Sequence, residues 1–186
     1  MEVFSTTIKE VILFKPRVFK DSRGCFFESY NANTLKEIGI HATFVQDNQS
    51  QSTRGVLRGL HYQTGAHAQA KLVRVLEGEV YDVAIDIRVG SPTYGQYFGA
   101  ILSAENGHQM FIPRGFAHGF VVLSPTATFF YKCDNFYNKE SEGGIIWNDA
   151  SIAIDWKIDT NEILLSEKDE ILPTIEHCKN GFVYNA

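Results

Sequence analysis

The stretches Arg58-Gly59-Leu60-His61-Tyr62-Gln63 and Pro113-Arg114-Gly115-Phe116-Ala117-His118-Gly119 decide the fold of this chain. In the first stretch, Gly55 is followed by five residues and then by His61, with Gln63 two positions further on. Glycine and apolar residues surround the histidine, as they would on a short strand that delivers it into a barrel interior. The first stretch therefore predicts a strand that carries a polar side chain into a pocket.

The second stretch completes a pattern that resembles the two metal-binding motifs of cupin barrels. Gly107 is followed by five residues, Pro-x-Gly, two residues and His118, which matches the second cupin motif. The first cupin motif has a second histidine where this chain has Gln63. A catalytic metal site needs about three protein ligands, and here two histidines share the region with Arg58 and Lys71. We expect a cupin scaffold with no metal, in which acid–base side chains occupy the pocket.

The composition is typical of a globular protein with a large core. Hydrophobic residues make up 44% and aromatic residues 13% of the 186 positions, which favours an all-β barrel whose pocket has stacking faces. The net charge of −5 argues against a broad nucleic-acid surface, and we expect no membrane segment. Three widely spaced cysteines without a CxxC pair, together with an N-terminus that lacks a basic and apolar leader, predict a cytoplasmic protein.

Hydrophobic periodicity predicts many short strands in a single domain that spans residues 1–186. From Lys71 the pattern has period two, and after a turn at Glu77-Gly78 it continues to Ile87 with Asp82 and Asp86 alternating with apolar residues. Further strands are expected at Met110–Ile112, Gly119–Leu123, Ala127–Lys132, Ile145–Trp147 and Ile152–Trp156. Helix is expected only at Asn33–Gly39, capped by Asn and Gly, and after Ser166. The pattern predicts an all-β, jelly-roll barrel with short peripheral helices, one of them near the C-terminus.

Four residues are candidates for chemistry, and each also has a purely structural interpretation. His61 is either a general base or a core histidine, and the neighbouring Arg58 favours the base because core strands rarely carry charge. Lys71 either stabilises a developing oxyanion or protects an edge strand. Tyr131 is either a proton donor or a core aromatic residue. Asp169 either fixes the tautomer of the histidine or belongs to a helix cap with Ser166, which the spacing alone favours.

The N-terminal third contains polar segments whose role the pattern leaves open. Residues 17–28 interleave charges with aromatic residues, which suits a nucleotide base and phosphate and equally an amphipathic hairpin. The chain has neither a GxGxxG sequence nor a Walker motif. Any grip on phosphate must therefore come from Arg and Lys side chains.

Taken together, these segments resemble the dTDP-4-dehydrorhamnose 3,5-epimerase family along almost the whole chain. The motifs that carry the resemblance include Phe19-x-Asp-x-Arg23-Gly, Phe44-Val-Gln46-Asp-Asn48-Gln-Ser50, Gly55-Val-Leu-Arg58-Gly-Leu-His61-Tyr-Gln, Lys71-Leu-Val-Arg-Val, Val83-Ala-Ile-Asp-Ile-Arg88, Ser91-Pro-Thr, Ile112-Pro-Arg-Gly-Phe-Ala-His118-Gly-Phe, Tyr131-Lys, Ile146-Trp-Asn-Asp149 and Leu165-Ser-Glu-Lys-Asp169. A colinear set of this kind is far more specific than any one motif.

The resemblance implies a cofactor-free epimerisation of dTDP-4-keto-6-deoxy-D-glucose at C3 and C5, giving dTDP-4-keto-L-rhamnose. It makes His61 the base, Asp169 its orienting carboxylate, Lys71 the cation at the C4 oxygen and Tyr131 the acid on the opposite face. It implies that the substrate is bound by Phe19, Arg23, Glu28, Gln46, Asp47, Asn48, Arg58, His118, Tyr137, Glu142 and Lys168. Phe136 is an alternative to Tyr137 as the residue that stacks on the base.

The resemblance also implies a homodimer whose sites draw on the neighbouring subunit, with the N-terminal segment as the crossing element. Other functions remain open at this point. The chain can be a C3-only or C5-only epimerase, because pocket shape decides product scope. Further alternatives are a non-catalytic sugar-nucleotide-binding cupin, a metal-dependent cupin and a keto-isomerase of a related dTDP-sugar.

Overall fold

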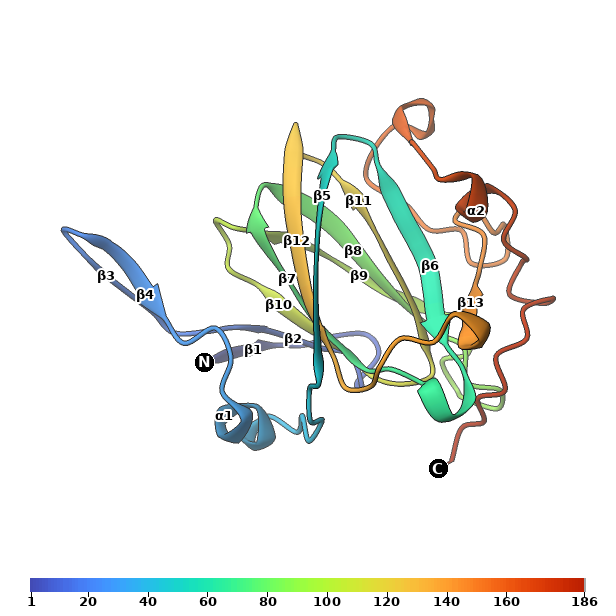
Figure 1. Cartoon of the computed structure of the whole chain (residues 1–186), viewed down its shortest axis with the longest axis horizontal. Helices are drawn as coiled ribbons and strands as arrows, with labels where there is room; N and C mark the ends of the chain where they lie inside the picture. The colour runs from blue at the N-terminus through green and yellow to red at the C-terminus, as the bar shows by residue number, and fades with distance from the viewer. Residues whose placement is uncertain (186) are drawn as a thin grey trace.

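The computed structural model describes residues 1–185, which form two antiparallel sheets that face each other (Figure 1). The six-stranded sheet has the order β1 (Glu2–Phe4), β2 (Ile12–Lys15), β10 (Gln109–Ile112), β7 (Lys71–Glu77), β12 (Thr126–Cys133) and β5 (Gln46–Thr53). The five-stranded sheet has the order β13 (Glu142–Gly144), β6 (Leu57–Gln63), β11 (Phe116–Val122), β8 (Glu79–Asp86) and β9 (Tyr97–Ser103). The predicted all-β jelly roll is confirmed, and within residues 1–185 no hydrogen-bonded strands close the two sheets into one cylinder.

The core between the sheets follows from the period-two alternation of the strands. Val73 and Val75 point inward from β7, and Phe129 joins them from β12. Phe120 and Val122 of β11 meet them from the five-stranded sheet. All five side chains are at most 6% exposed, so the burial of apolar surface between the sheets stabilises the two-layer fold.

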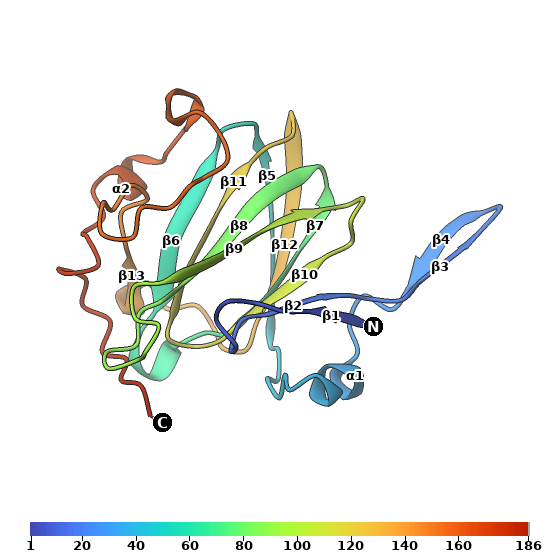
Figure 2. The same ribbon diagram turned by 180° about the vertical axis from the view of Figure 1, so that it is seen from behind.

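Two further apolar layers cover the outer faces of the sheets. Trp156 and Ile175 belong to the C-terminal segment, which packs on the outer side of the five-stranded sheet against Tyr62 and Ile85 (Figure 2). Leu35, next to Phe14 and Phe111, covers the outer side of the six-stranded sheet. The inner strands of the sheets are therefore covered on both faces, which explains why every residue of β10 and β11 is buried.

The two helices are short and capped by side chains. Helix α1 (Ala32–Glu37) begins after Asn31, whose side chain accepts hydrogen bonds from two backbone N–H groups of the first turn. The predicted cap at Asn33 is therefore wrong by two residues, whereas Gly39 follows the helix end with a φ of 89°. Helix α2 (Glu167–Glu170) follows Ser166 as predicted. The described part of the chain also contains single turns of 3-10 helix at Gly65–His67, Lys139–Ser141 and Thr160–Glu162. No helix within residues 1–185 is long and apolar enough to cross a membrane.

Two predicted strands are wrong because burial alone does not make a strand. Residues 145–147 and 152–156 have no strand structure; the strand in this region is β13, which ends at Gly144. Ile145, Ile152 and Trp156 are buried as part of the layer on the outer face of the sheet. Conversely, β5 was not predicted, because its sequence is polar throughout.

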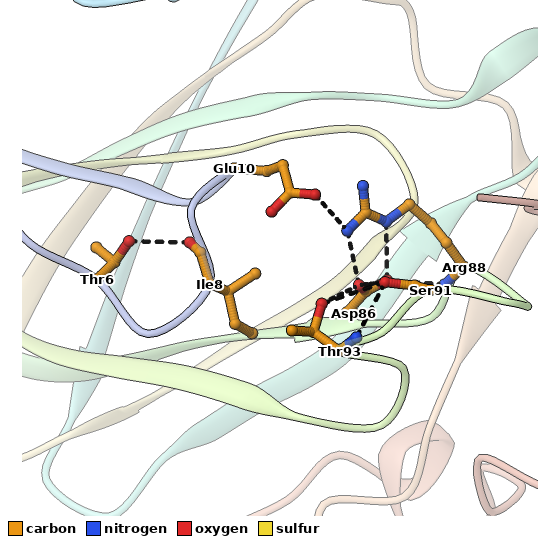
Figure 3. Close-up of polar contacts among 7 residues, drawn as sticks. All are labelled: Thr6, Ile8, Glu10, Asp86, Arg88, Ser91 and Thr93. Atoms are coloured by element: carbon orange, nitrogen blue, oxygen red, sulfur yellow. Dashed lines mark hydrogen bonds and ion pairs between the residues drawn. The ribbon is translucent and has the colours of Figure 1, made fainter. Parts of the chain in front are cut away.

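Strand β8 carries two carboxylates whose burial the alternation did not reveal, since Asp82 and Asp86 are both 0% exposed. Asp86 accepts hydrogen bonds from Arg88 Nε at 2.9 Å, Ser91 Oγ at 2.5 Å and Thr93 Oγ1 at 2.7 Å (Figure 3). Arg88 also donates to Glu10 at 2.9 Å. This network ties the end of β8 to the turn between β1 and β2.

Strands β3 (Val18–Asp21) and β4 (Gly24–Phe27) form a separate hairpin that projects away from the two sheets (Figure 1). The hairpin interpretation of residues 17–28 is thus confirmed. Phe19 is 52% and Phe26 71% exposed. Phe19 pairs with Phe26 across the hairpin, so the two exposed apolar side chains are neighbours on this projecting element.

Candidate active site

The two histidines that define the sequence motifs stand opposite each other on neighbouring strands. His61 of β6 pairs with His118 of β11, and the register shifts directly after this pair. Gly59 and Gly119 allow the close approach, because a Cβ added at Gly59 would lie 2.5 Å from the Cα of Gly119. The glycines of both motifs therefore serve to bring the two imidazoles to one place in the sheet.

His61 forms a short hydrogen bond with the side-chain carboxylate of Asp169. Its Nε2 lies 2.6 Å from Asp169 Oδ1, and Asp169 is 3% exposed. Burial opposes ionisation of Asp169, but the contacts with His61, the backbone N–H of Gly59 and Ser166 outweigh it and lower its pKa. An ionised carboxylate only accepts hydrogen bonds, so Nε2 carries the proton and Nδ1 presents a lone pair. Asp169 also gives its backbone N–H to the Ser166 cap, so both interpretations of this residue hold geometrically.

Lys71 lies in the same pocket beside a second carboxylate–histidine pair. Its Nζ is 3.5 Å from His118 Nδ1, and His118 Nε2 is 2.9 Å from Asp82 Oδ2. Burial lowers the pKa of Lys71, although Cys133, Asp82 and Glu142 act in the opposite direction. Strand β7 lies inside the six-stranded sheet, so Lys71 does not protect a sheet edge.

Tyr131 approaches the pocket from the opposite wall. It belongs to β12 of the six-stranded sheet, whereas His61 belongs to β6 of the five-stranded sheet. The Lys71 Nζ lies 5.9 Å from the centre of its ring. Burial raises the pKa of Tyr131 to about 12, so the phenol keeps its proton at neutral pH. An imidazole and a phenol therefore lie on facing walls of the pocket, with the Lys71 side chain beside the phenol.

These side chains line a cavity of about 580 Å³ between the sheets. Its walls are formed by Asn48, Gln49, Ser50, Val56, Leu57, Arg58, His61, Lys71, His118, Phe120, Phe129, Tyr131, Leu164, Leu165, Ser166, Lys168 and Asp169. A second hollow of about 260 Å³ shares four of them and adds Gln46, Tyr62, Gln63, Gln69, Tyr137 and Glu142. Most of the predicted site residues thus meet in two adjoining hollows.

Polar contacts hold the residues at the rim in place. Tyr137 donates from its hydroxyl to Glu142 at 3.1 Å and from its backbone N–H to Gln46 at 3.1 Å. Glu142 also forms an ion pair with Lys168. Arg58 donates to the hydroxyl of Ser52 at 3.1 Å, which orients its guanidinium beside the larger hollow.

Four predicted binding residues do not line these hollows within one chain. Phe19 and Arg23 lie on the projecting hairpin, where Arg23 pairs with Asp21, and Glu28 follows directly after it. Asp47 is exposed and accepts from Lys132 at 2.9 Å, because alternation along β5 turns it away from its neighbours Gln46 and Asn48.

Two features of the site were not anticipated from the sequence. Asp82 is the fully buried partner of His118, and an aspartate inside an otherwise apolar strand was the available signal. Gln63, which replaces a cupin metal ligand, accepts from the backbone N–H of Asn138 at 2.9 Å and so anchors the loop that carries Tyr137. Among residues 1–185, no three His, Cys, Asp or Glu side chains lie close enough together to hold a metal ion.

The family model described as dTDP-4-dehydrorhamnose 3,5-epimerase matches residues 5–177 of the chain. A protein of that name from Pseudomonas aeruginosa is 58% identical over 170 residues, which cover 91% of this chain and 93% of the relative. A crystal structure from Legionella pneumophila, in complex with dTDP-4-keto-L-rhamnose, is 48% identical with a TM-score of 0.95 and covers 100% of this chain and 99% of the other. A structure from Elizabethkingia anophelis is 55% identical with a TM-score of 0.91, covering 95% and 97%.

Proposed function

This chain belongs to the dTDP-4-dehydrorhamnose 3,5-epimerase family, and we propose that it inverts C3 and C5 of dTDP-4-keto-6-deoxy-D-glucose. The product is dTDP-4-keto-L-rhamnose, the compound bound in the Legionella pneumophila relative. The observation that carries the proposal is the pairing of His61 with Asp169 across the cavity from Tyr131, with Lys71 beside it. Every group that a ketone-assisted proton transfer needs is present.

The C4 ketone makes the hydrogens on C3 and C5 acidic, because the resulting carbanion is delocalised onto the carbonyl oxygen. His61 takes the proton with Nδ1, since its Nε2–H is engaged by Asp169. The Lys71 ammonium stabilises the negative charge that develops on the C4 oxygen. The two groups act together, as removing a proton without stabilising the oxyanion leaves most of the barrier in place.

Inversion requires that the proton returns from the other face of the sugar ring. Tyr131 stands on the facing sheet and keeps its phenolic proton, because burial raises its pKa to about 12. It donates this proton to the carbanion, and exchange with solvent then restores both His61 and Tyr131. The same arrangement acts on C3 and C5 in turn, because both carbons flank the C4 carbonyl.

The nucleotide is held at the rim of the cavity. Arg58 and Lys168 supply cations for the diphosphate, and neither requires a glycine-rich loop. Tyr137 is the better candidate to stack on the thymine, because it lines the smaller hollow, whereas Phe136 does not. Gln46, which Tyr137 contacts, is placed to read the edge of the base.

A second copy of the chain completes the site. Phe19, Arg23 and Glu28 lie on or directly after a hairpin that projects from its own body, with apolar side chains exposed (Figure 1). In a two-fold dimer, each hairpin crosses to the rim of its partner's cavity and adds an arginine for the diphosphate. This explains why these three residues lie outside the cavity of their own chain.

Mixed dimers test this arrangement. Neither His61→Ala nor Arg23→Ala is expected to be fully active alone, but their co-expression creates heterodimers with one intact site. Random assortment makes half of the dimers mixed, so about a quarter of the wild-type activity should return. No gain above the sum of the two variants would place Arg23 and His61 of each site in the same chain.

Incubation with dTDP-4-keto-6-deoxy-D-glucose in D₂O tests the reaction itself. Deuterium at both C3 and C5, with the L-lyxo configuration read from NMR coupling constants, is the expected result. Label at one carbon only would identify a C3-only or C5-only epimerase. Absence of label would refute the epimerase on this substrate and favour a non-catalytic binding protein.

The cytoplasm is the proposed location. Cys25, Cys133 and Cys178 are all unpaired, and Cys25 is exposed. Free thiols persist in a reducing compartment, which supports this location.

A further inference from the structure

Asp82 is the most deeply buried charged group near the cavity, yet the proton transfers above do not use it. It lies on β8 with 0% exposure, between Tyr81 and Val83. Its two carboxylate oxygens are 2.9 and 3.1 Å from His118 Nε2. Burying a carboxylate destabilises the fold unless a partner compensates it, so packing alone does not account for an aspartate at this position.

The contact between Lys71 and His118 indicates which imidazole nitrogen of His118 carries the proton. As an ammonium group, Lys71 has three donors and no acceptor, and His118 Nδ1 then accepts a hydrogen bond from its Nζ, which lies 3.5 Å away. The proton of the neutral imidazole then sits on Nε2 and requires an acceptor. Asp82 is that acceptor. In this arrangement Lys71 Nζ donates to His118 Nδ1, and His118 Nε2 donates to Asp82.

The charges around Lys71 come from several strands. Asp82 lies on β8, Glu142 on β13, Cys133 on β12 and His118 on β11. Glu142 is partly exposed and already paired with Lys168, while burial raises the pKa of Cys133 to about 11 and keeps it neutral. Asp82 is the carboxylate near Lys71 that solvent screens least.

We propose that Asp82 is a positioning residue of the epimerase: through His118 it holds the Lys71 ammonium protonated and directed at the C4 oxygen of the substrate. The inference rests on the proposed function. Without the carboxylate, His118 loses its fixed tautomer and Lys71 loses both an acceptor and a nearby negative charge. Negative charge then develops on the C4 oxygen without a correctly placed cation to stabilise it.

The variant Asp82→Asn tests the proposal, because it removes the charge and keeps the shape. In a plot of kcat against pH, the alkaline limb should move to lower pH by about one unit, because the Lys71 ammonium loses a nearby negative charge. At fixed pH, kcat should fall more than KM rises, because Lys71 acts on charge that develops in the transition state. A merely structural role would lower kcat without moving the limb.

Asp86→Asn is the matched control. Asp86 lies four residues further along β8, is equally buried and accepts several hydrogen bonds (Figure 3). Neither Asp86 nor its hydrogen-bond partners line the cavity. This variant should lower the thermal unfolding temperature and leave the alkaline limb where it is. If both variants move the limb equally, the shift comes from general loosening of β8 and the proposal is wrong.

Two measurements do not depend on turnover and so separate this inference from the proposed reaction. In the substrate-free protein, a ¹³C NMR titration of the lysine ε-carbons should show Lys71 losing its proton at lower pH in Asp82→Asn. In the wild type, ¹⁵N NMR should find the proton of His118 on Nε2. A proton on Nδ1 would overturn the proposal even if Asp82→Asn does not fold, and even if the protein is inactive on this sugar.

Discussion

The cavity holds two carboxylate–histidine pairs that use the same atoms in different surroundings. In both, an imidazole Nε2 faces a buried carboxylate, at 2.6 Å in His61–Asp169 and 2.9 Å in His118–Asp82. The His61 side chain is 28% exposed, whereas that of His118 is 6% exposed. The Nδ1 of His118 is occupied by Lys71, while the described residues give His61 Nδ1 no hydrogen-bond partner.

The environment of each pair decides what it can do. Burial opposes ionisation of Asp169, but hydrogen bonds outweigh it and lower its pKa; for Asp82, burial prevails and raises the pKa. Burial also lowers the pKa of His118, so this imidazole is neutral at pH 7. The accessible pair, His61–Asp169, is suited to exchange protons with a substrate. The enclosed pair, His118–Asp82, is suited to hold a neighbouring cation in place.

Exchanging the two histidines for alanine breaks the comparison most directly. His61→Ala should lower turnover by roughly 10²–10⁴-fold with the fold intact, because the base is lost. His118→Ala should leave deuterium exchange detectable, because it weakens the support of Lys71 and removes no proton acceptor. Isotope exchange at C3 and C5, with thermal unfolding as a folding check, measures both. The roles are reversed if His61→Ala exchanges faster than His118→Ala.

Removing the cation that the enclosed pair supports should have the next largest effect. Lys71→Met keeps most of the side-chain volume and should lower kcat by roughly 10²–10³-fold, as for loss of one oxyanion-stabilising donor. Lys132→Met is the control, since Lys132 lies on the neighbouring strand but pairs with the exposed Asp47. Equal losses of kcat in the two variants would argue against a specific role for Lys71.

Tyr131→Phe separates the return of the proton from its removal. Epimerised product should fall by about 10²-fold, because the donor on the facing wall is lost. Deuterium exchange on the His61 side should persist, since the base and the cation remain. Product analysis and isotope exchange in the same reaction give the two rates, and a parallel fall in both would remove Tyr131 as the acid.

Asp169→Asn tests the carboxylate of the accessible pair. Its Ser166 cap uses the backbone N–H, so the helix start survives the substitution. Turnover should fall by at least about 10–100-fold, the range for carboxylates that orient the imidazole ligands of metal sites. Steady-state kinetics and circular dichroism provide the measurement. Turnover equal to that of the wild type would mean that Asp169 does not hold His61 in the tautomer that leaves Nδ1 free.

The family resemblance, and not the residue spacing, suggested the His61–Asp169 pair, because the spacing alone favoured a helix cap for Asp169. Neither suggested the His118–Asp82 pair. His61 and His118 stand in motifs whose glycines have a visible reason, because Gly59 and Gly119 let β6 and β11 approach. Asp82 was missed, because alternation places a residue on a face without saying whether that face meets water or another sheet. For a two-layer sandwich, the inner face of one sheet is the core of both.

Contacts between residues far apart in the sequence, or between two copies of the chain, could not be predicted from the sequence pattern for the same physical reason. The apolar residues at 152–156 read as a strand, but they are buried against the outside of a sheet without joining its ladder. Strand β5 is polar throughout, and only its pairing with β12 makes it a strand. The resemblance assigns Arg23 to the site, although among residues 1–185 of its own chain the ion-pair partner of Arg23 is its hairpin neighbour Asp21.

The pH dependence offers the smallest effect and the finest test of the contrast. Burial lowers the pKa of Lys71 and raises that of Tyr131 to about 12, so the ammonium loses its proton first as pH rises. The alkaline limb of kcat should therefore lie at the same pH in Tyr131→Phe as in the wild type. Lys71→Arg should keep its charge and move that limb to higher pH, at the cost of a lower maximal rate. If the alkaline limb moves in Tyr131→Phe and stays in Lys71→Arg, the group that titrates is the phenol of Tyr131. The His118–Asp82 pair would then have no effect on the pH profile of kcat.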